Sequence, residues 1–180
     1  SESDAEKEFV ESYCKKHGII FEYFKIANYH HDNFHQEART IRYQFFEQVV
    51  KKYHAKYLMT AHHGDDLIET VLMRLVRGSS IYGYHGFSRV TELCDYTLVR
   101  PLITITRDDI INYIDQNQIP YVTDMSNFKD DYTRNRYRKY IVPKLKEENP
   151  HVHEKFWKFS QMILECSHYI RDIVQNKEGM

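Results

Sequence analysis

The stretch YLMTAHHGDDLIETVLMRLVRGSS, residues 57–80, runs from a short apolar strand pattern into an amphipathic helix pattern. Side chains three positions apart are neighbours on a helix, so a helix that starts after Gly64 places the carboxylates of Asp66 and Glu69 on one face. Another face carries apolar residues that we expect to pack inward. These residues are Ile68, Val71, Leu72, Leu75 and Val76.

Two histidines, His62 and His63, stand at the end of the predicted strand. Alternate side chains of a strand point to opposite sides, so we expect one histidine to reach the crevice at the strand end and the other to pack. In α/β folds ligands bind at such junctions, because free helix N–H groups face the crevice. The junction is therefore the candidate site.

The paired carboxylates of Asp66 and Glu69 suit a hard cation, since magnesium takes oxygen ligands and keeps waters for a bound phosphate. We therefore predict Mg2+ on this pair. A plainer interpretation is that the acids favour a helix N-terminus, where negative charge complements the dipole. A zinc site is disfavoured, because H-H-x-D-D lacks the H-E-x-x-H spacing that puts two histidines on one helical face.

Helices and strands alternate along the chain, which predicts an α/β fold with a parallel sheet and helices on both of its faces. The Gly-rich region 79–96 is expected to be a loop, and so is region 121–133. Helices are predicted at 4–17, 36–55, 64–78, 106–117, 134–149 and 151–175, and strands at 19–26, 56–61 and 96–103.

Composition excludes several classes of protein. Lysine plus arginine number 25 against 26 aspartate plus glutamate, so overall charge favours neither a nucleic-acid binder nor a binder of acidic ligands. Three scattered cysteines, Cys14, Cys94 and Cys166, argue against a disulfide framework and favour a reducing cytoplasm. No apolar run approaches the roughly 18 residues that a membrane span needs, so we expect a soluble protein.

Four ordered segments carry a resemblance to a known family. Residues 60–78, TAHHGDDLIETVLMRLVRG, resemble the second signature of the PP-loop ATP-pyrophosphatase superfamily, and specifically of the tRNA(Ile)-lysidine synthetases. EARTIRYQFF (37–46), RPLITITRDDI (100–110) and TDMSNFKDDYTRNRYR (123–138) resemble three further blocks of that family. Leu67 stands where the family commonly has glutamine. The resemblance implies an adenine-nucleotide alpha-hydrolase-like, Rossmann-like three-layer fold.

The chain departs from the family at its front, because the S-G-G-x-D-S loop that cradles the ATP phosphates is absent from the sequence. The resemblance therefore implies a fold truncated at the N-terminus, with residues 1–150 as a partial catalytic domain and 151–180 as a helical linker to further domains. A parallel sheet without some of its strands exposes apolar surface. This leaves a homodimer, a segment swap and another partner as alternatives.

The activity implied by the resemblance joins L-lysine to C2 of the wobble cytidine in the anticodon loop of tRNA(Ile). ATP would adenylate the C2 carbonyl oxygen with release of pyrophosphate, and the lysine amine would then displace AMP. ATP and Mg2+ are the implied cofactors, and this fragment alone is expected to be inactive. The alternatives are a metal-dependent phosphohydrolase, a fragment that keeps only an RNA- or protein-contacting surface, and a sulfur-inserting PP-loop relative, which the lack of paired cysteines disfavours.

The resemblance also implies roles for individual residues. Catalytic roles fall to His62, Asp66, Glu69 and Arg134, with Asp66 and Glu69 as metal ligands. Ligand contacts fall to Arg39, Arg42, His63, Arg77 and Arg138. Of these, Arg39 and Arg42 would line the nucleotide or lysine site, and Arg138, like Arg134, would bind pyrophosphate or the RNA backbone. Each arginine has an ordinary alternative, either as a surface ion-pair partner or, for Arg77, as a cation at a helix C-terminus.

Overall fold

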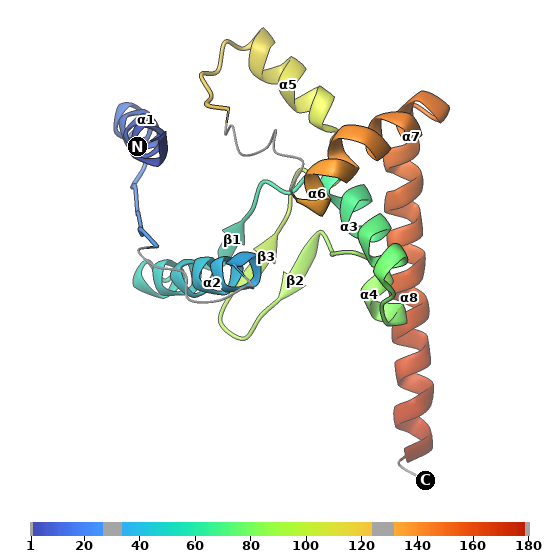
Figure 1. Cartoon of the computed structure of the whole chain (residues 1–180). Coiled ribbons are helices and arrows are strands. Elements are labelled where there is room, and N and C mark those ends of the chain that lie inside the picture. The colour runs from blue at the N-terminus through green and yellow to red at the C-terminus, as the bar shows by residue number, and fades with distance from the viewer. Residues whose placement is uncertain (1, 27–33, 124–131, 179–180) are drawn as a thin grey trace. The chain divides into compact units, whose positions relative to one another are not determined.

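A computed structural model describes residues 2–26, 34–123 and 132–178 (Figure 1). The chain divides into two units: residues 1–58 with 94–96, and residues 59–93 with 97–180. The first unit contains helices α1 (Glu2–Lys16) and α2 (Phe34–Lys52), as the sequence predicts. The second unit contains α3 (Gly64–Arg77), α4 (Ile81–Tyr84), β2 (Val90–Glu92), β3 (Thr97–Val99), α5 (Arg107–Gln116), α6 (Thr133–Arg136), α7 (Val142–Glu148) and α8 (Val152–Glu178).

The described residues contain one small sheet of three strands, in the order β1 (Tyr57–Met59), β3, β2. Strands β2 and β3 pair antiparallel, with Val90 opposite Val99. This differs from the predicted parallel sheet, because the two strands follow each other through a short turn, which permits only an antiparallel pair. Region 79–96, predicted to be a loop, holds α4 and β2 instead.

The predicted strand at 19–26 is not formed in the described residues. Its β-branched and aromatic residues satisfy the sequence pattern, but a strand also needs a neighbour for its backbone hydrogen bonds. The side chains of Ile20 and Phe24 are 68% and 53% exposed. The prediction of a loop at 121–133 falls mostly on residues outside the described part of the chain.

Helix α3 is the centre of the second unit. It packs on α8 and α4, and on the helical run from α6 to α7 (Figure 1). Leu67 and Val71 form one buried cluster with Ile103, while Ile68 forms another with Val142 and Val152. The predicted apolar face is confirmed for Ile68 and Val71, but Leu75 and Val76, one turn further on, are 49% and 75% exposed.

The basic region after residue 132 is helical on both sides of Pro143, as predicted, but it is not uniform. Residues Tyr137–Ile141 form a π-helical segment, in which Val142 N–H donates to Tyr137 O, five residues back. Pro143 has no N–H to donate to the carbonyl four residues earlier, which explains a wider turn at this point. Helix α5 begins with the predicted capping box of Thr106 and Asp109.

Candidate functional site

The start of α3 is fixed by backbone hydrogen bonds to two neighbouring segments. Thr60 N–H donates to Val99 O at 3.0 Å, and Gly64 N–H donates to Ile105 O at 2.8 Å. A Cβ atom on Gly64 would lie 3.0 Å from Ile105 O, so glycine permits this close approach. The first turn of the helix is thereby held at the end of β3.

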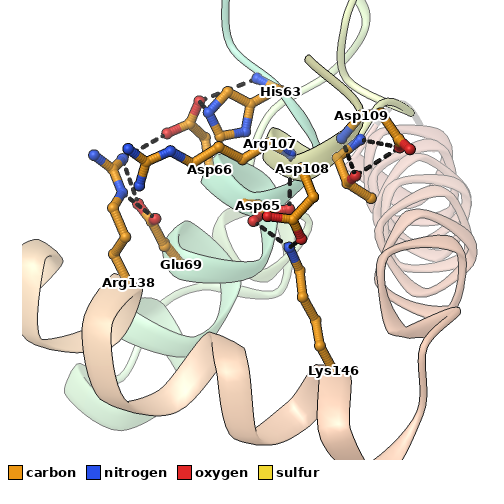
Figure 2. A network of polar contacts seen from close by, with 10 residues as sticks. His63, Asp65, Asp66, Glu69, Arg107, Asp108, Asp109, Arg138 and Lys146 are labelled. Atoms are coloured by element: carbon orange, nitrogen blue, oxygen red, sulfur yellow. Dashed lines mark hydrogen bonds and ion pairs between the residues drawn. The ribbon is translucent and has the colours of Figure 1, made fainter. Parts of the chain in front are cut away.

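Asp66 and Glu69 lie on one face of α3, as predicted, and both contact the guanidinium of Arg138 (Figure 2). Arg138 Nε donates to Glu69 Oε1 at 2.8 Å, and its Nη2 donates to Glu69 Oε2 at 3.2 Å and to Asp66 Oδ1 at 3.1 Å. The Glu69 side chain is fully buried. A planar guanidinium with several donors suits such a two-carboxylate partner.

Arg134, one helical turn before Arg138, also reaches α3. Its Nε lies 3.5 Å from Glu69 Oε2, and its Nη2 donates to Thr70 Oγ1 at 2.8 Å. The Arg134 side chain is 42% exposed, so part of it faces solvent. We call Asp66, Glu69, Arg134 and Arg138 the acid–arginine cluster.

The two histidines separate, as the strand alternation predicts. His63 joins the acid–arginine cluster, with its backbone N–H donating to Asp66 Oδ2 at 3.0 Å and its Nε2 3.4 Å from the same oxygen. His62 instead lies against the ring of Phe87, with centroids 5.3 Å apart, and its Nδ1 is 2.8 Å from Thr60 Oγ1. Burial lowers the pKa of His63 and outweighs the nearby Asp66 carboxylate.

Burial also governs the charged members of the cluster. It raises the pKa of Glu69, and the hydrogen bonds from Arg138 oppose this increase. For Arg138 burial acts to lower the pKa, but the hydrogen bond to Glu69 and the charges of the nearby carboxylates together outweigh it, and the pKa is raised. The guanidinium is therefore charged, and it supplies the countercharge for two carboxylates.

A second ion pair at the same helix start involves residues outside the predicted ligase site. Lys146 Nζ lies 2.7 Å from Asp65 Oδ2 and 2.8 Å from Asp108 Oδ2 (Figure 2). Asp65 is 5% exposed and also accepts a long hydrogen bond of 3.5 Å from Arg107 N–H. Burial acts to lower the pKa of Lys146, but its bonds to Asp108 and Asp65 raise it overall. The signal available in the sequence was the position of Asp65 at a helix N-terminus.

Magnesium on the Asp66 and Glu69 pair stays a prediction. No group of three or more His, Cys, Asp or Glu side chains that could hold a metal ion occurs in the described part of the chain. Asp66 and Glu69 converge as predicted, but they converge on Arg138, which takes the place of a cation. Two carboxylates alone leave most positions around a magnesium ion to phosphate oxygens and water.

The other predicted arginines lie elsewhere. Arg39 and Arg42 are exposed on α2 in the first unit, where Arg39 lies 5.1 Å from the ring centroid of Tyr43. Arg77 is exposed at the end of α3, where its Nε donates to Met73 O at 3.2 Å. It lines a cavity of about 420 Å³ together with Arg74 and Arg100, which sequence reasoning did not select.

No helix among the residues that the structure describes is long and apolar enough to cross a membrane.

The acid–arginine cluster has the composition of a site for charged groups: two carboxylates, two guanidiniums and a histidine at a strand-to-helix junction. Its partly exposed Arg134 can meet an anion, while the buried Arg138 holds the carboxylates in place.

Comparison with known proteins gives three findings. The profile of the PP-loop domain family matches residues 1–145. The tRNA(Ile)-lysidine synthases of Bacillus thuringiensis subsp. konkukian and Bacillus subtilis are 44% and 39% identical in sequence to this chain. Each alignment covers 98% of this chain. This chain spans 38% and 39% of the length of those two relatives. The U34-tRNA thiolase NcsA from Methanococcus maripaludis superposes with a TM-score of 0.70 at 15% identity, over 89% of this chain and 56% of that one.

Proposed function

We propose that this chain, which belongs to the PP-loop domain family, is the catalytic portion of an ATP-dependent tRNA(Ile)-lysidine synthase. The observation that carries the proposal is the convergence of two segments that resemble the synthases. Asp66 and Glu69 come from the 60–78 segment, and Arg134 and Arg138 from the 123–138 segment, and all four meet at the start of α3. A helix N-terminus at a strand end is a general site for phosphate-bearing ligands.

The proposed reaction joins L-lysine to C2 of the wobble cytidine of tRNA(Ile). ATP adenylates the C2 carbonyl oxygen, pyrophosphate leaves, and the lysine amine displaces AMP. Negative charge grows on the departing phosphates, and fixed cationic groups stabilise such charge. Arg134 has the most exposed side chain of the cluster, so we assign it to the pyrophosphate or to the RNA backbone.

The remaining predicted roles stay proposals. We assign His62 to the adenylate or its phosphates, and Arg39, Arg42, His63, Arg77 and Arg138 to the binding of ATP or lysine. Magnesium is proposed to arrive with the phosphates of ATP. No step is assigned to it on Asp66 and Glu69, because their oxygens bind Arg138.

The finer architecture is likewise proposed. We infer a three-layer fold, in which a parallel sheet has helices on both of its faces. The likeness to the U34-tRNA thiolase supports this inference and bears on the fold alone. We infer a catalytic region at 1–150 and a helical linker at 151–180, supported by the family match over 1–145 and by the greater length of the relatives. A cytoplasmic location and a homodimer complete the proposal, and light scattering of the purified chain tests the dimer.

The alternatives have less support. A metal-dependent phosphohydrolase needs a metal centre, and the described residues provide no group of metal-binding side chains. A sulfur-inserting activity would use paired cysteines, whereas Cys14, Cys94 and Cys166 are free thiols. An RNA-binding role without catalysis rests on the basic segment alone.

A chimera tests the proposed function. This chain replaces the matching region of the Bacillus subtilis synthase, and incorporation of radiolabelled lysine into tRNA(Ile) is measured together with ATP-dependent pyrophosphate release. We expect lysidine formation, and a loss of about 100-fold in turnover for Arg134→Ala, the size of loss typical when one charge-stabilising donor is removed. Arg136→Ala, an exposed arginine on the same helix whose Nη2 donates to Thr133 Oγ1, is the matched control. A folded chimera that makes no lysidine would refute the proposal.

A further inference from the structure

A second cationic site lies near the other end of α3. A cavity of about 420 Å³ is lined by Arg74, Arg77 and Arg100, by the aromatic side chains of Tyr82 and Phe87, and by small polar residues that include Ser88. We call it the arginine pocket. None of its lining residues is acidic. Three positive charges therefore meet in one concavity without a carboxylate among them, which is the composition of an anion site.

Arg100 gives the pocket an unused hydrogen-bond donor. The residue is 7% exposed, its Nη1 donates to Ser88 O at 2.8 Å, and its guanidinium lies 5.2 Å from the ring centroid of Phe87. Its Nε is buried and has no hydrogen-bond partner among the described residues. A buried donor without a partner costs free energy, so a shift of the guanidinium that lets a ligand accept from it is favoured.

The other two arginines, Arg74 and Arg77, have different roles in the pocket. Arg74 Nη1 donates to Gly86 O at 2.6 Å and also to Gly83 O, and so fixes the glycine-rich segment that walls the pocket. Arg77 is exposed and uses its Nε on Met73 O, which leaves both of its terminal nitrogens without a protein partner in the described part of the chain. Arg74 thus holds the wall of the pocket in place, and Arg77 has terminal N–H groups that can donate to a ligand.

Aromatic rings line the same pocket and connect it to the start of α3. Tyr82 is 44% exposed, and the guanidinium of Arg171 lies 5.5 Å from its ring centroid. Phe87 lines the pocket and also contacts His62, at the strand-to-helix junction. Arginine with exposed aromatic rings is the combination that binds unstacked nucleotides of single-stranded RNA, through phosphate contacts and base stacking.

We propose that the arginine pocket binds one unstacked nucleotide of an RNA loop, with its phosphate on Arg77 and Arg100 and its base against Tyr82, which gives Arg77 an RNA contact in place of the ATP or lysine contact assigned to it above. The proposal rests on the proposed function, which supplies an anticodon loop as substrate, and it adds a site for a nucleotide beside the reacting one. A free phosphate or nucleotide offers the same anionic group, so the experiment must separate the two sources.

Binding of a fluorescein-labelled RNA hairpin with the tRNA(Ile) anticodon loop, measured by anisotropy across a salt series, tests the pocket. Arg77→Ala should weaken binding and reduce the slope of log affinity against log salt by about 1, the effect of one lost phosphate contact. Arg89→Ala removes an exposed arginine that does not line the pocket, and should keep the slope of the unmodified chain. Tyr82→Ala should weaken binding about 10-fold, and Tyr82→Phe should restore it.

Two results would overturn the proposal. One is equal hairpin binding by Arg77→Ala and Arg89→Ala, together with no effect of Tyr82→Ala. The other is Arg77-dependent binding of inorganic phosphate or ATP by calorimetry with no Arg77-dependent binding of the hairpin. Lysidine formation by the chimera is a separate readout. If the chimera is inactive but hairpin binding still depends on Arg77 and Tyr82, the proposed function fails and the RNA site stands.

Discussion

Arg138→Ala tests whether the acid–arginine cluster is held by one shared guanidinium. The substitution removes the donors to Glu69, which is fully buried, and to Asp66. Breaking a buried ion pair by deleting one partner costs about 3–5 kcal/mol. Arg134 Nε remains 3.5 Å from Glu69 Oε2, so we expect a loss near the lower limit, about 3 kcal/mol. For a chain of this size that lowers Tm by roughly 6–12 °C.

The single tryptophan, Trp157, packs against the buried Leu67 cluster, so its fluorescence in a urea titration reports unfolding of this unit. Burial raises the pKa of Glu69, and losing Arg138 raises it further. A carboxyl with a raised pKa binds a proton in the folded state first, so the defect should shrink as pH falls toward the ordinary value of 4.5. Arg136→Ala, an exposed neighbour, should stay within about 0.5 kcal/mol. Equal losses for the two variants, or a defect independent of pH, would refute the reasoning.

Three further substitutions test other parts of the same unit. Gly86→Ala forces φ of 82° on alanine and places a Cβ 2.7 Å from a leucine methyl carbon. It should therefore lower the free energy of unfolding in urea by more than about 1 kcal/mol. Gly78→Ala is the control and should cost less, because Gly78 has φ of 80° but no atom within 4 Å of the added Cβ. Burial lowers the pKa of His85, so the unmodified chain should lose thermal stability as pH falls through 6.5, where only the unfolded chain takes up the proton, and His85→Asn should flatten that dependence of Tm on pH. Lys146→Ala leaves the buried Asp65 without its cation and should cost about 3 kcal/mol by the same denaturation assay; a loss below about 0.5 kcal/mol would mean that the pair contributes nothing.

Local signals in the sequence predicted most helices correctly. The capping box at Thr106 and Asp109 and the apolar spacing of α3 depend only on residues a few positions apart, and such patterns report the helix that they form. The prediction of a strand at 19–26 was wrong, because a strand depends on more than local sequence. Strand formation depends on a pairing partner elsewhere in the chain, and composition cannot supply one.

The candidate site shows the same division. Helical spacing put Asp66 and Glu69 on one face, and the structure confirms it. That spacing cannot show whether a metal ion or a side chain meets them, because Arg138 comes from 69 residues further along the chain than Glu69. The resemblance selected Arg138 as a ligand contact. Its ion pairs with Asp66 and Glu69 are contacts of the tertiary structure, which spacing along the sequence does not predict. Lys146 was missed because its partners Asp65 and Asp108 lie 81 and 38 residues away in the chain, and spacing within one helix cannot show such contacts.

The π-helical segment at Tyr137–Ile141 sets the phase between Arg138 and Lys146. Eight residues of regular α-helix would leave these two side chains about 80° apart around the axis, whereas a wider turn between them reduces that angle. Both can then reach the first turn of α3. A one-residue deletion between them that restored ordinary winding would leave seven residues, about 700° of turn, so both side chains should still face α3, whereas a one-residue insertion should turn one of the two cations away from its carboxylates.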